Sequence, residues 1–500
     1  MRRFVGPISF VLVLAGLVLR LRQFAVWRSL WMDEAMLALN VVTRSFWDLF
    51  QPLDYNQGAP AGFLLLQKLA TLVFGENDVA LRLVPLAAAC VALVIFSRLS
   101  VRWFGAAGLA ALALFVIGTP LVEYACEAKQ YSTDVACTVI LLALLRPWFD
   151  GRVRVSDFRN LAVAGAAAIW FSHPAVFVLP GAGLLVLSRS LRFGREAVTA
   201  TAAVAVAWIA SFALLYGFSL RTLSSNVALL EYWQGAFAPF GQPELLAWLG
   251  SSLAAYLRDV VGVTADGIGG WLALLGFASL LRSRPGLAVT LAGPLLIALA
   301  ASGFGVYPFT GRLLLFSVPA TLLLIAAGID GLASLAAAAT ARAASSDAGV
   351  VARRIAEIML AVALLVAPSS VAIARFENPR NSEALRPALE YLLAHRQPSD
   401  GIYVYYGAKP AVRFYARSLA IPEGALLLGR AHRQEPDAYR SEIAPMLARP
   451  AAWFVFSHAC PVCPTDEWKL ILDELDRHGQ RVDSFETDGA AVFRYRFEQR

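Results

Sequence analysis

The chain has 500 residues, of which 58% are hydrophobic and only 16% charged, and its mean hydropathy is +0.61. Soluble globular proteins carry about 25% charged residues, so this composition excludes a large soluble core and indicates a polytopic membrane protein. The net charge of +7 rests on 39 arginines and 4 lysines, and the arginines stand in short clusters between apolar runs. Because that pattern follows the positive-inside rule, we expect the membrane, and no nucleic acid, as a partner.

Eleven apolar runs are candidates for membrane-spanning helices, which need about 20 mostly apolar residues. They are residues 4–21, 78–98, 106–122, 131–146, 160–172, 174–189, 196–218, 268–282, 286–302, 312–329 and 354–373. The first run follows Arg2 and Arg3 as in a secretory signal, but no small-residue cleavage site comes after it, so we expect a retained helix. A twelfth run, residues 61–74, is shorter and is interrupted by Lys68.

The arginine clusters decide whether residues 61–74 cross the membrane. If that segment does not cross, the clusters fall on the side of the N-terminus, as expected for the cytoplasmic face. They are Arg98 and Arg102, Arg146 to Arg159, Arg189 to Arg195, Arg282 and Arg284, and Arg342 to Arg354. We therefore predict an interfacial or re-entrant helix at 61–74, eleven spans, a cytoplasmic N-terminus and a place in the cell (inner or plasma) membrane. Arg20, Arg22 and Arg28 run against this rule.

This topology gathers the polar loops on the extracytoplasmic face. They are the first loop 22–77, the segments 123–130, 172–174, 219–265 and 303–311, and the tail 374–500. The fold class is thus mainly α, with a transmembrane core over 1–373. Residues 330–352, rich in Ala and Ser, are expected to form a cytoplasmic linker.

The tail, residues 374–500, alternates strand-like and helix-like pieces. Strands are expected at 401–408 and 451–458, and helices at 410–419 and 466–479. Two further strands flank the Asp-Gly turn in RVDSFETDGAAVFRYRF. We predict a small extracytoplasmic α/β domain.

The pair Asp33-Glu34 stands where the first span has just ended. One interpretation is structural, because acidic residues at a helix N-terminus are stabilised by the helix dipole. The other is functional, because acidic residues held near a bilayer are costly and mark sites. The preceding Trp31 and the polar face favour the second interpretation.

The stretch EYACEAKQYSTD places Glu123, Glu127, Tyr131 and Asp134 on one stripe if it is helical, with Lys129 on another side. Such a stripe is either a surface ion-pair network or a site in which Lys129 holds an anionic head group. Three more candidate positions face the same space. They are Arg312, which either snorkels to the interface or binds a phosphate, His173 beside Pro174, and Tyr307.

The five cysteines divide into two groups. Cys90, Cys126 and Cys137 lie in or beside apolar helices and are expected to be buried. Cys460 and Cys463 form a CxxC motif in the polar tail. A zinc site needs more Cys or His ligands at matching spacing, so in an oxidising compartment we predict a local disulfide.

Several stretches resemble the GT-C glycosyltransferases, notably the protein-mannosyltransferase and aminoarabinose-transferase type of family 39. They are the acidic pair, QGAPAGFLLLQKLATLVFGENDVALRLVP, EYACEAKQY and YPFTGRLLLFSVP, all within residues 5–330. The resemblance implies sugar transfer from a polyprenyl-phosphate carrier at the extracytoplasmic leaflet. It places Asp33 on the family's catalytic acid, with Glu34 beside it. Lys129 falls where relatives often have Arg, and Tyr131 keeps an aromatic residue.

The resemblance also has a gap at residues 57–60, where many members carry a charged residue before Pro-Pro. This chain has Gln57-Gly-Ala-Pro, so a relative's metal contacts are not transferred, no cofactor is certain, and a divalent metal stays open.

The resulting hypothesis is an inverting glycosyltransferase for a lipid, glycan or protein acceptor. Asp33 is the base, with Glu34 as its neighbour, and Lys129, Arg312 and Tyr131 bind the donor phosphate. Candidate substrate-binding residues are Glu127, His173, Tyr307 and Gln57. The alternative is a transporter or flippase of a lipid-linked saccharide. It predicts charges in the middle of spans and an internal repeat, and the sequence has neither.

Overall fold

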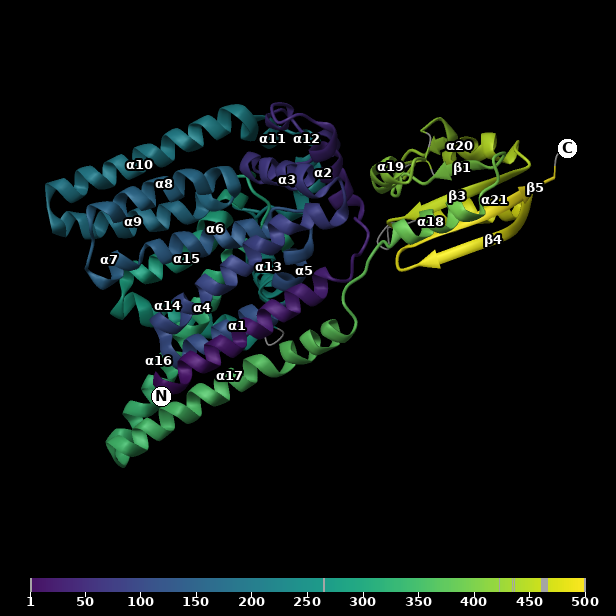
Figure 1. The fold of residues 1–500 in the computed structure, drawn as a ribbon. Helices are drawn as coiled ribbons and strands as arrows, with labels where there is room; N and C mark the ends of the chain where they lie inside the picture. The colour runs from purple at the N-terminus through teal and green to yellow at the C-terminus, as the bar shows by residue number, and fades with distance from the viewer. Residues whose placement is uncertain are drawn as a thin grey trace.

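The structure is a computed structural model that describes residues 2–263, 266–421, 423–433, 435, 437–459 and 466–498. A helical bundle accounts for the chain up to Glu377, and a small sheet with its own helices lies beyond one end of that bundle (Figure 1). The bundle helices are α1 (Arg2–Phe24), α2 (Met32–Thr43), α3 (Ala61–Phe74), α4 (Asp78–Ile117), α5 (Thr119–Glu123), α6 (Tyr131–Leu144), α7 (Arg146–Asp150), α8 (Val155–Phe171), α9 (Ala175–Phe193), α10 (Arg195–Leu215), α11 (Arg221–Ser224), α12 (Val227–Tyr232), α13 (Leu245–Ala255), α14 (Asp266–Ser283), α15 (Pro285–Gly303), α16 (Val318–Ala343) and α17 (Ser346–Glu377). We call the end that faces the sheet the site end.

Among the described residues, eight helices are long and apolar enough to cross a membrane. Helix α1 exposes a row of large apolar side chains, among them Phe10, Val11 and Val18, which is the surface that a lipid-facing helix requires. The chain is therefore a multi-pass membrane protein. Each of the eleven predicted segments coincides with helix, but α8 has only 17 residues and α14 is similarly short, so the predicted number of eleven is not confirmed.

The longest apolar stretch, α4, is two helices joined at Gly105. The φ angle of Gly105 is 54°, a left-handed value that favours glycine, and the chain reverses there. The rings of Phe96 and Phe115 stack with centroids 4.4 Å apart. A straight helix would separate them by about 28 Å, so the two halves form a hairpin, as the runs 78–98 and 106–122 predicted.

Helix α3 carries the segment for which the sequence predicted no crossing. Its 14 residues span about 21 Å, less than the roughly 30 Å of a hydrocarbon core. Its outer side exposes Leu69, Leu72, Val73 and Phe74, while its inner side packs against the bundle. An apolar outer face on a helix too short to span is what an interfacial helix requires.

The linker prediction for residues 330–352 is wrong. Helix α16 continues to Ala343, α17 begins at Ser346, and only a short break separates them. Alanine is the strongest helix former, and the Ser345 side chain caps α17 by accepting a hydrogen bond from the Ala348 N–H. The many alanines therefore favour the continuation of α16 and α17 through most of residues 330–352.

The C-terminal sheet region contains five strands in the order β2-β1-β3-β5-β4. Strands β2, β1 and β3 run parallel, whereas β5 is antiparallel to both β3 and β4. Its elements are α18 (Leu385–His395), β1 (Gly401–Val404), α19 (Lys409–Ser418), β2 (Leu426–Leu428), α20 (Ala438–Leu447), β3 (Ala451–Ser457), α21 (Glu467–His478), β4 (Gly479–Thr487) and β5 (Ala490–Phe497). The predicted strands and helices of the tail are all present, and α18, α20 and β2 were missed. Cys460 and Cys463, the predicted disulfide, lie outside the described residues.

One hydrophobic cluster joins the sheet region to the bundle. It runs from α2 and α3, through Leu37 and Phe63, into α18, α19 and one face of the sheet at Trp453 and Val492. The other face of the sheet packs against α20 and α21 in a separate cluster. The sheet region therefore packs against the first loop, and α19 contacts α2.

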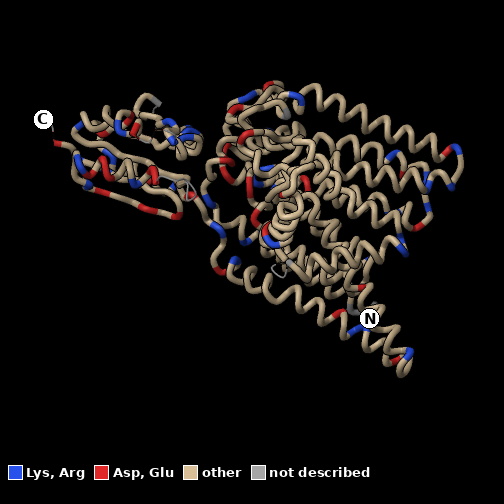
Figure 2. Tube along the Cα trace, turned by 180° about the vertical axis from the view of Figure 1, so that it is seen from behind, with Lys and Arg blue, Asp and Glu red and all other residues tan. Residues whose placement is uncertain are grey.

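The loops that the sequence assigned to one face do meet at the site end. Gln130 donates to the Gly58 carbonyl at 3.3 Å, and Ala238 N–H donates to Ser302 at 2.9 Å. Basic residues gather at the opposite end, where α9 turns into α10 and α16 turns into α17 (Figure 2). The grouping is thus observed, while its direction across the membrane stays a prediction.

Reporter fusions test that direction. We expect a fusion after Ala344, between α16 and α17, to report the cytoplasm, and a fusion after residue 500 to report the extracytoplasmic side, because the arginines gather around the first position. Paired alkaline phosphatase and fluorescent protein reporters measure both. A C-terminal fusion that is active only in the cytoplasm would reverse the assignment.

Candidate active site

Asp33 and Glu34 are the second and third residues of α2, so their side chains diverge by about 100°. The chain enters α2 from the short loop after α1 at the site end. Their carboxylates consequently reach two different polar clusters, one partly open and one fully buried.

Asp33 lies between two cations. Its Oδ1 is 3.0 Å from Lys129 Nζ, and its Oδ2 is 2.8 Å from an Arg312 terminal nitrogen. Burial disfavours the charged carboxylate, but Lys129 and Arg312 outweigh it and hold the pKa of Asp33 below its usual value. The Asp33 side chain is still 16% exposed, in contrast to the fully buried Glu34.

Gln57 completes this cluster. Its Nε2 donates to Asp33 Oδ1 at 3.2 Å, and its Oε1 accepts from Lys129 Nζ at 2.5 Å. The Gln57 amide thus bonds to both the carboxylate and the ammonium, and the structure brings these three residues to one place. The cluster carries one negative and two positive charges.

Arg312 is oriented by two aromatic rings. Its guanidinium carbon lies 5.3 Å from the Trp31 ring centroid and 5.4 Å from the Tyr131 ring centroid. Cation–π contacts of this kind hold the planar group on a defined side without using its hydrogen-bond donors. Arg312 therefore faces Asp33 and does not snorkel away from the bundle.

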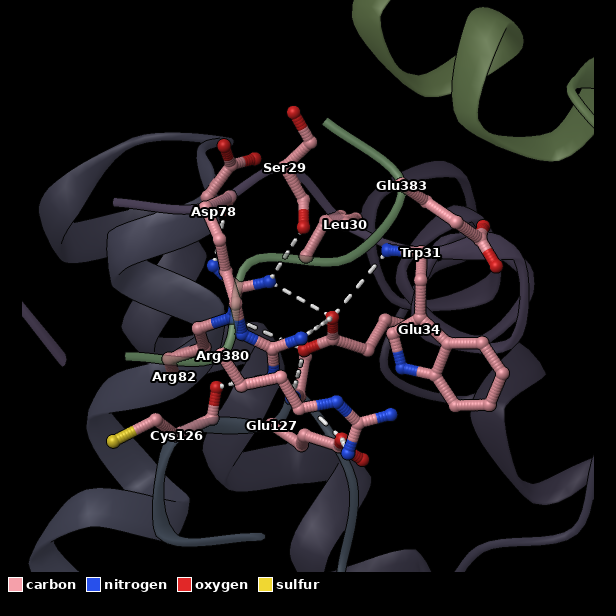
Figure 3. Close-up of polar contacts among 12 residues, drawn as sticks. Ser29, Leu30, Trp31, Glu34, Asp78, Arg82, Cys126, Glu127, Arg380 and Glu383 are labelled. Carbon is pink, nitrogen blue, oxygen red and sulfur yellow. Dashed lines mark hydrogen bonds and ion pairs between the residues drawn. The ribbon is translucent and has the colours of Figure 1, made fainter. Parts of the chain in front are cut away.

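Glu34 belongs to the buried cluster (Figure 3). Its two oxygens accept from Arg82 at 3.0 and 2.8 Å, and Oε1 also accepts from the Ala128 N–H at 2.7 Å. Burial opposes its charge, but Arg28 and Arg82 hold the pKa of Glu34 below its usual value. With no exposed surface, Glu34 is suited to hold the residue next to Lys129 in place, and not to reach a substrate.

Glu127 faces the Glu34 cluster and not Asp33. Its Oε1 lies 3.7 Å from Arg28 and 3.6 Å from Arg380, a residue just beyond α17 (Figure 3). Burial and the nearby Glu34 raise the pKa of Glu127 to about 7, although both arginines oppose that shift. Its predicted role in substrate binding is therefore less direct than that of Gln57.

The predicted helical stripe is wrong. Helix α5 ends at Glu123, residues 124–126 form one 3-10 turn, and the backbone at Glu127 is extended, so the helix is interrupted before α6 begins at Tyr131. Glu123 turns away to pair with Arg380 at 2.9 Å. The turn, not a helix face, is what brings Lys129 to Asp33.

His173 and Tyr307 are the two remaining candidates for substrate binding. Burial lowers the pKa of His173 to about 4, and its Nε2 has no hydrogen-bond partner in the described part of the chain. Tyr307 donates to the Leu313 carbonyl at 2.7 Å. Across the described residues, neither side chain bonds to Asp33, so their roles stay predictions.

The sequence reasoning missed three arginines of the buried cluster, Arg28, Arg82 and Arg380. Arg82 carried a signal, because a charge inside an apolar run needs a partner, and Glu34 is that partner. Among the described residues, no group of three or more His, Cys, Asp or Glu side chains is placed to hold a metal ion.

No protein-family model matches this chain, and no curated protein matches its sequence. The crystal structure of ArnT from Cupriavidus metallidurans in the apo state matches with a TM-score of 0.53 and 14% identity, over 98% of each chain. ArnT from the same organism bound to undecaprenyl phosphate matches with a TM-score of 0.54 and 14% identity, over 98% of this chain and 97% of that chain. The chain thus has the GT-C fold that the sequence resemblance implied.

Removing Glu34 should destabilise the protein far more than removing an exposed acid of the same loop. Glu34→Ala leaves the Arg82 guanidinium buried without its paired carboxylate, and breaking such a pair costs about 3–5 kcal/mol. Asp48→Ala is the matched control, since Asp48 is exposed. Thermal unfolding in detergent measures both, and equal melting of the two variants would contradict this account.

Proposed function

We propose that this protein is a membrane glycosyltransferase that takes a sugar from a polyprenyl-phosphate carrier and transfers it to an acceptor hydroxyl at the extracytoplasmic face. The observation that carries the proposal is the pair of cations on Asp33. Lys129 and Arg312 share one carboxylate at the end of an apolar bundle, which is where a lipid-anchored phosphate arrives. The ArnT structure with undecaprenyl phosphate supports the same donor class.

The excess positive charge suits an incoming anion. Burial lowers the pKa of Lys129, and repulsion from Arg312 adds to this effect, while Asp33 opposes it. A phosphate between the two cations relieves that repulsion, and charge-assisted hydrogen bonds then hold it. We propose that Lys129 and Arg312 form this phosphate clamp, with Tyr131 as the ring that aims Arg312.

Donor binding also prepares Asp33 as a base. While both cations pair with Asp33, its carboxylate is a weak proton acceptor, because they stabilise the charged form. When the donor phosphate draws them away, the pKa of Asp33 rises. The base is therefore activated only when the donor is bound, which limits wasteful reaction of an empty site.

The reaction that follows is a single displacement with inversion. The acceptor oxygen forms a bond to the anomeric carbon, and the bond from that carbon to the phosphate oxygen breaks. The electron pair leaves with polyprenyl phosphate, whose negative charge Lys129 and Arg312 stabilise. The acceptor's hydroxyl proton passes to the Asp33 carboxylate. A hexose or a pentose fits this scheme, as does a lipid, glycan or protein acceptor.

The Asp33→Asn variant distinguishes a catalytic base at this position from a carboxylate with a structural role. Loss of a positioned base typically lowers the rate by about 10²–10⁴-fold. The variant should still bind undecaprenyl phosphate at least as tightly as the natural protein, because no carboxylate competes for Lys129 and Arg312. Turnover is measured on lipid-linked sugars extracted from a strain that lacks the protein, and binding is measured in nanodiscs. Near-normal turnover by Asp33→Asn would remove the base assignment.

Lys129→Ala and Arg312→Ala test the phosphate clamp. Each change removes a charged hydrogen-bond donor worth about 1.5–3 kcal/mol, so affinity for undecaprenyl phosphate should fall about tenfold or more. Lys68→Ala is the control, because Lys68 on α3 donates to the Val42 carbonyl, away from the clamp. If both clamp variants bind undecaprenyl phosphate like Lys68→Ala, the phosphate lies elsewhere.

A further inference from the structure

The segment that leads into Asp33 is held by the C-terminal sheet region. Each residue from Ser29 to Met32 has a contact there, although the partners lie more than 300 positions along the chain. Ser29 Oγ accepts from the Arg386 N–H at 3.0 Å, the Leu30 N–H donates to Tyr415 Oη at 2.7 Å, the Trp31 ring stacks on His458 at 6.5 Å, and the Met32 N–H donates to Glu383 Oε2 at 2.9 Å. The backbone before Asp33 is thus fixed from outside the bundle.

Glu383 makes the contact closest to Asp33. Met32 is the first residue of α2, so its N–H has no hydrogen-bond acceptor within the helix. The N-cap residue, Trp31, does not accept this hydrogen bond through its side chain. Glu383 fills that place from the other region, and its negative charge also suits the positive end of the helix dipole. Asp33 is the next residue along the chain.

The backbone at this contact is strained. Glu383 has a φ of 55° and His458 a φ of 59°. Both values lie in the left-handed backbone region, which residues other than glycine rarely adopt. The two residues bond to each other, with His458 Nδ1 2.7 Å from Glu383 Oε1. A residue in such a conformation persists where its surroundings impose it, commonly at functional sites.

Neighbouring groups hold Glu383 in that conformation. The adjacent Ala384 N–H donates to the Asp488 carbonyl at 2.8 Å, and a Cβ on Gly489 would lie 3.0 Å from the Glu383 nitrogen. The turn between β4 and β5 therefore packs against the Glu383 backbone, while the Glu383 carboxylate accepts a hydrogen bond from the first N–H of α2. Figure 3 shows Glu383 beside Trp31, with Glu34 on the far side of that residue.

The same contact reaches the phosphate clamp through Trp31. One neighbour of the Trp31 ring is His458, and another is the Arg312 guanidinium at 5.3 Å. Glu383 thus bonds both to the start of the helix that carries Asp33 and to the histidine that packs on the ring beside Arg312.

We propose that Glu383 is a positioning residue for the transfer reaction, which sets the start of α2 and thereby the direction of the Asp33 carboxylate. This inference rests on the proposed function of Asp33. It assigns the C-terminal sheet region a part in turnover, although Glu383 itself touches neither substrate nor the reacting atoms. A misplacement of a base by about 1 Å is enough to lower a rate by up to 10²-fold.

The test compares Glu383→Ala and Glu383→Gln with Arg417→Ala in the full chain in nanodiscs. Arg417 on α19 pairs with Glu76 of the first loop at 2.8 Å, so this ion pair also joins the sheet region to the bundle. Arg417 has no described contact with residues 29–33, and Arg417→Ala is therefore the matched control. Hydrogen exchange over residues 29–37 reports the start of α2 without any substrate. Turnover on extracted lipid-linked sugars and affinity for undecaprenyl phosphate report the two halves of the site.

We expect Glu383→Ala to speed exchange over residues 29–37 and to lower kcat about tenfold or more, with undecaprenyl phosphate affinity within twofold of the natural protein. Glu383→Gln keeps an oxygen for the Met32 N–H and should restore kcat to within about threefold. Arg417→Ala should change neither the exchange nor kcat. Faster exchange with unchanged kcat in Glu383→Ala would overturn the positioning role, as would a glutamine variant as slow as the alanine one.

The two proposals fail in different ways. If Asp33→Asn turns over normally, the proposed base is wrong, yet the exchange result for Glu383→Ala still reports whether Glu383 orders α2. If Glu383→Ala is unfolded, Glu383→Gln decides the question, because unchanged exchange and kcat there support the hydrogen bond while a loss of kcat overturns it.

Discussion

The arrangement of the site depends on the hydrogen bonds and ion pairs of the buried Glu34 carboxylate. It joins three segments that the chain delivers separately: the start of α2, Arg82 on α4, and the Ala128 N–H in the turn before α6. A carboxylate with no exposure is tolerated in an apolar bundle only when its charge is matched and its lone pairs are used. Since Lys129 follows Ala128, satisfying Glu34 also places the ammonium that Asp33 requires.

Division of labour between two adjacent acids follows from helix geometry. Side chains of consecutive residues diverge, so Glu34 points into the bundle while Asp33 points to the partly open side. The inner acid has arginine partners and no exposed surface, whereas the outer acid pairs with Lys129 and Arg312 and its side chain is 16% exposed. In the proposed reaction the two acids have different tasks: Glu34 keeps its partners to anchor the loops, whereas Asp33 releases Lys129 and Arg312 to a phosphate.

The sequence predicted what depends on composition and on local pattern. Apolar runs gave the helices, arginine placement gave the end at which loops gather, and the resemblance brought Asp33, Lys129 and Arg312 to one site. It failed where long-range contacts override local preference. A stripe of Glu123, Glu127, Tyr131 and Asp134 required a continuous helix, but the backbone at Glu127 is extended and Glu127 pairs with Arg28. Nothing in the local sequence around Glu383 or Arg380 indicates that these residues meet the first loop.

The same limit explains why a division of the chain near residue 374 does not describe how the site is built. Composition changes there from apolar to polar, and this change is real. However, the side chains that hold residues 29–32 come from beyond it, and the hydrophobic cluster of α2 continues into the sheet region. A short loop between a membrane helix and an interfacial helix has few neighbours with which to fix its backbone. Because α2 lies at the site end of the bundle, part of its surroundings comes from outside the membrane core. The sheet region supplies contacts to residues 29–32, and these come from residues that carry no mark of catalysis in the sequence.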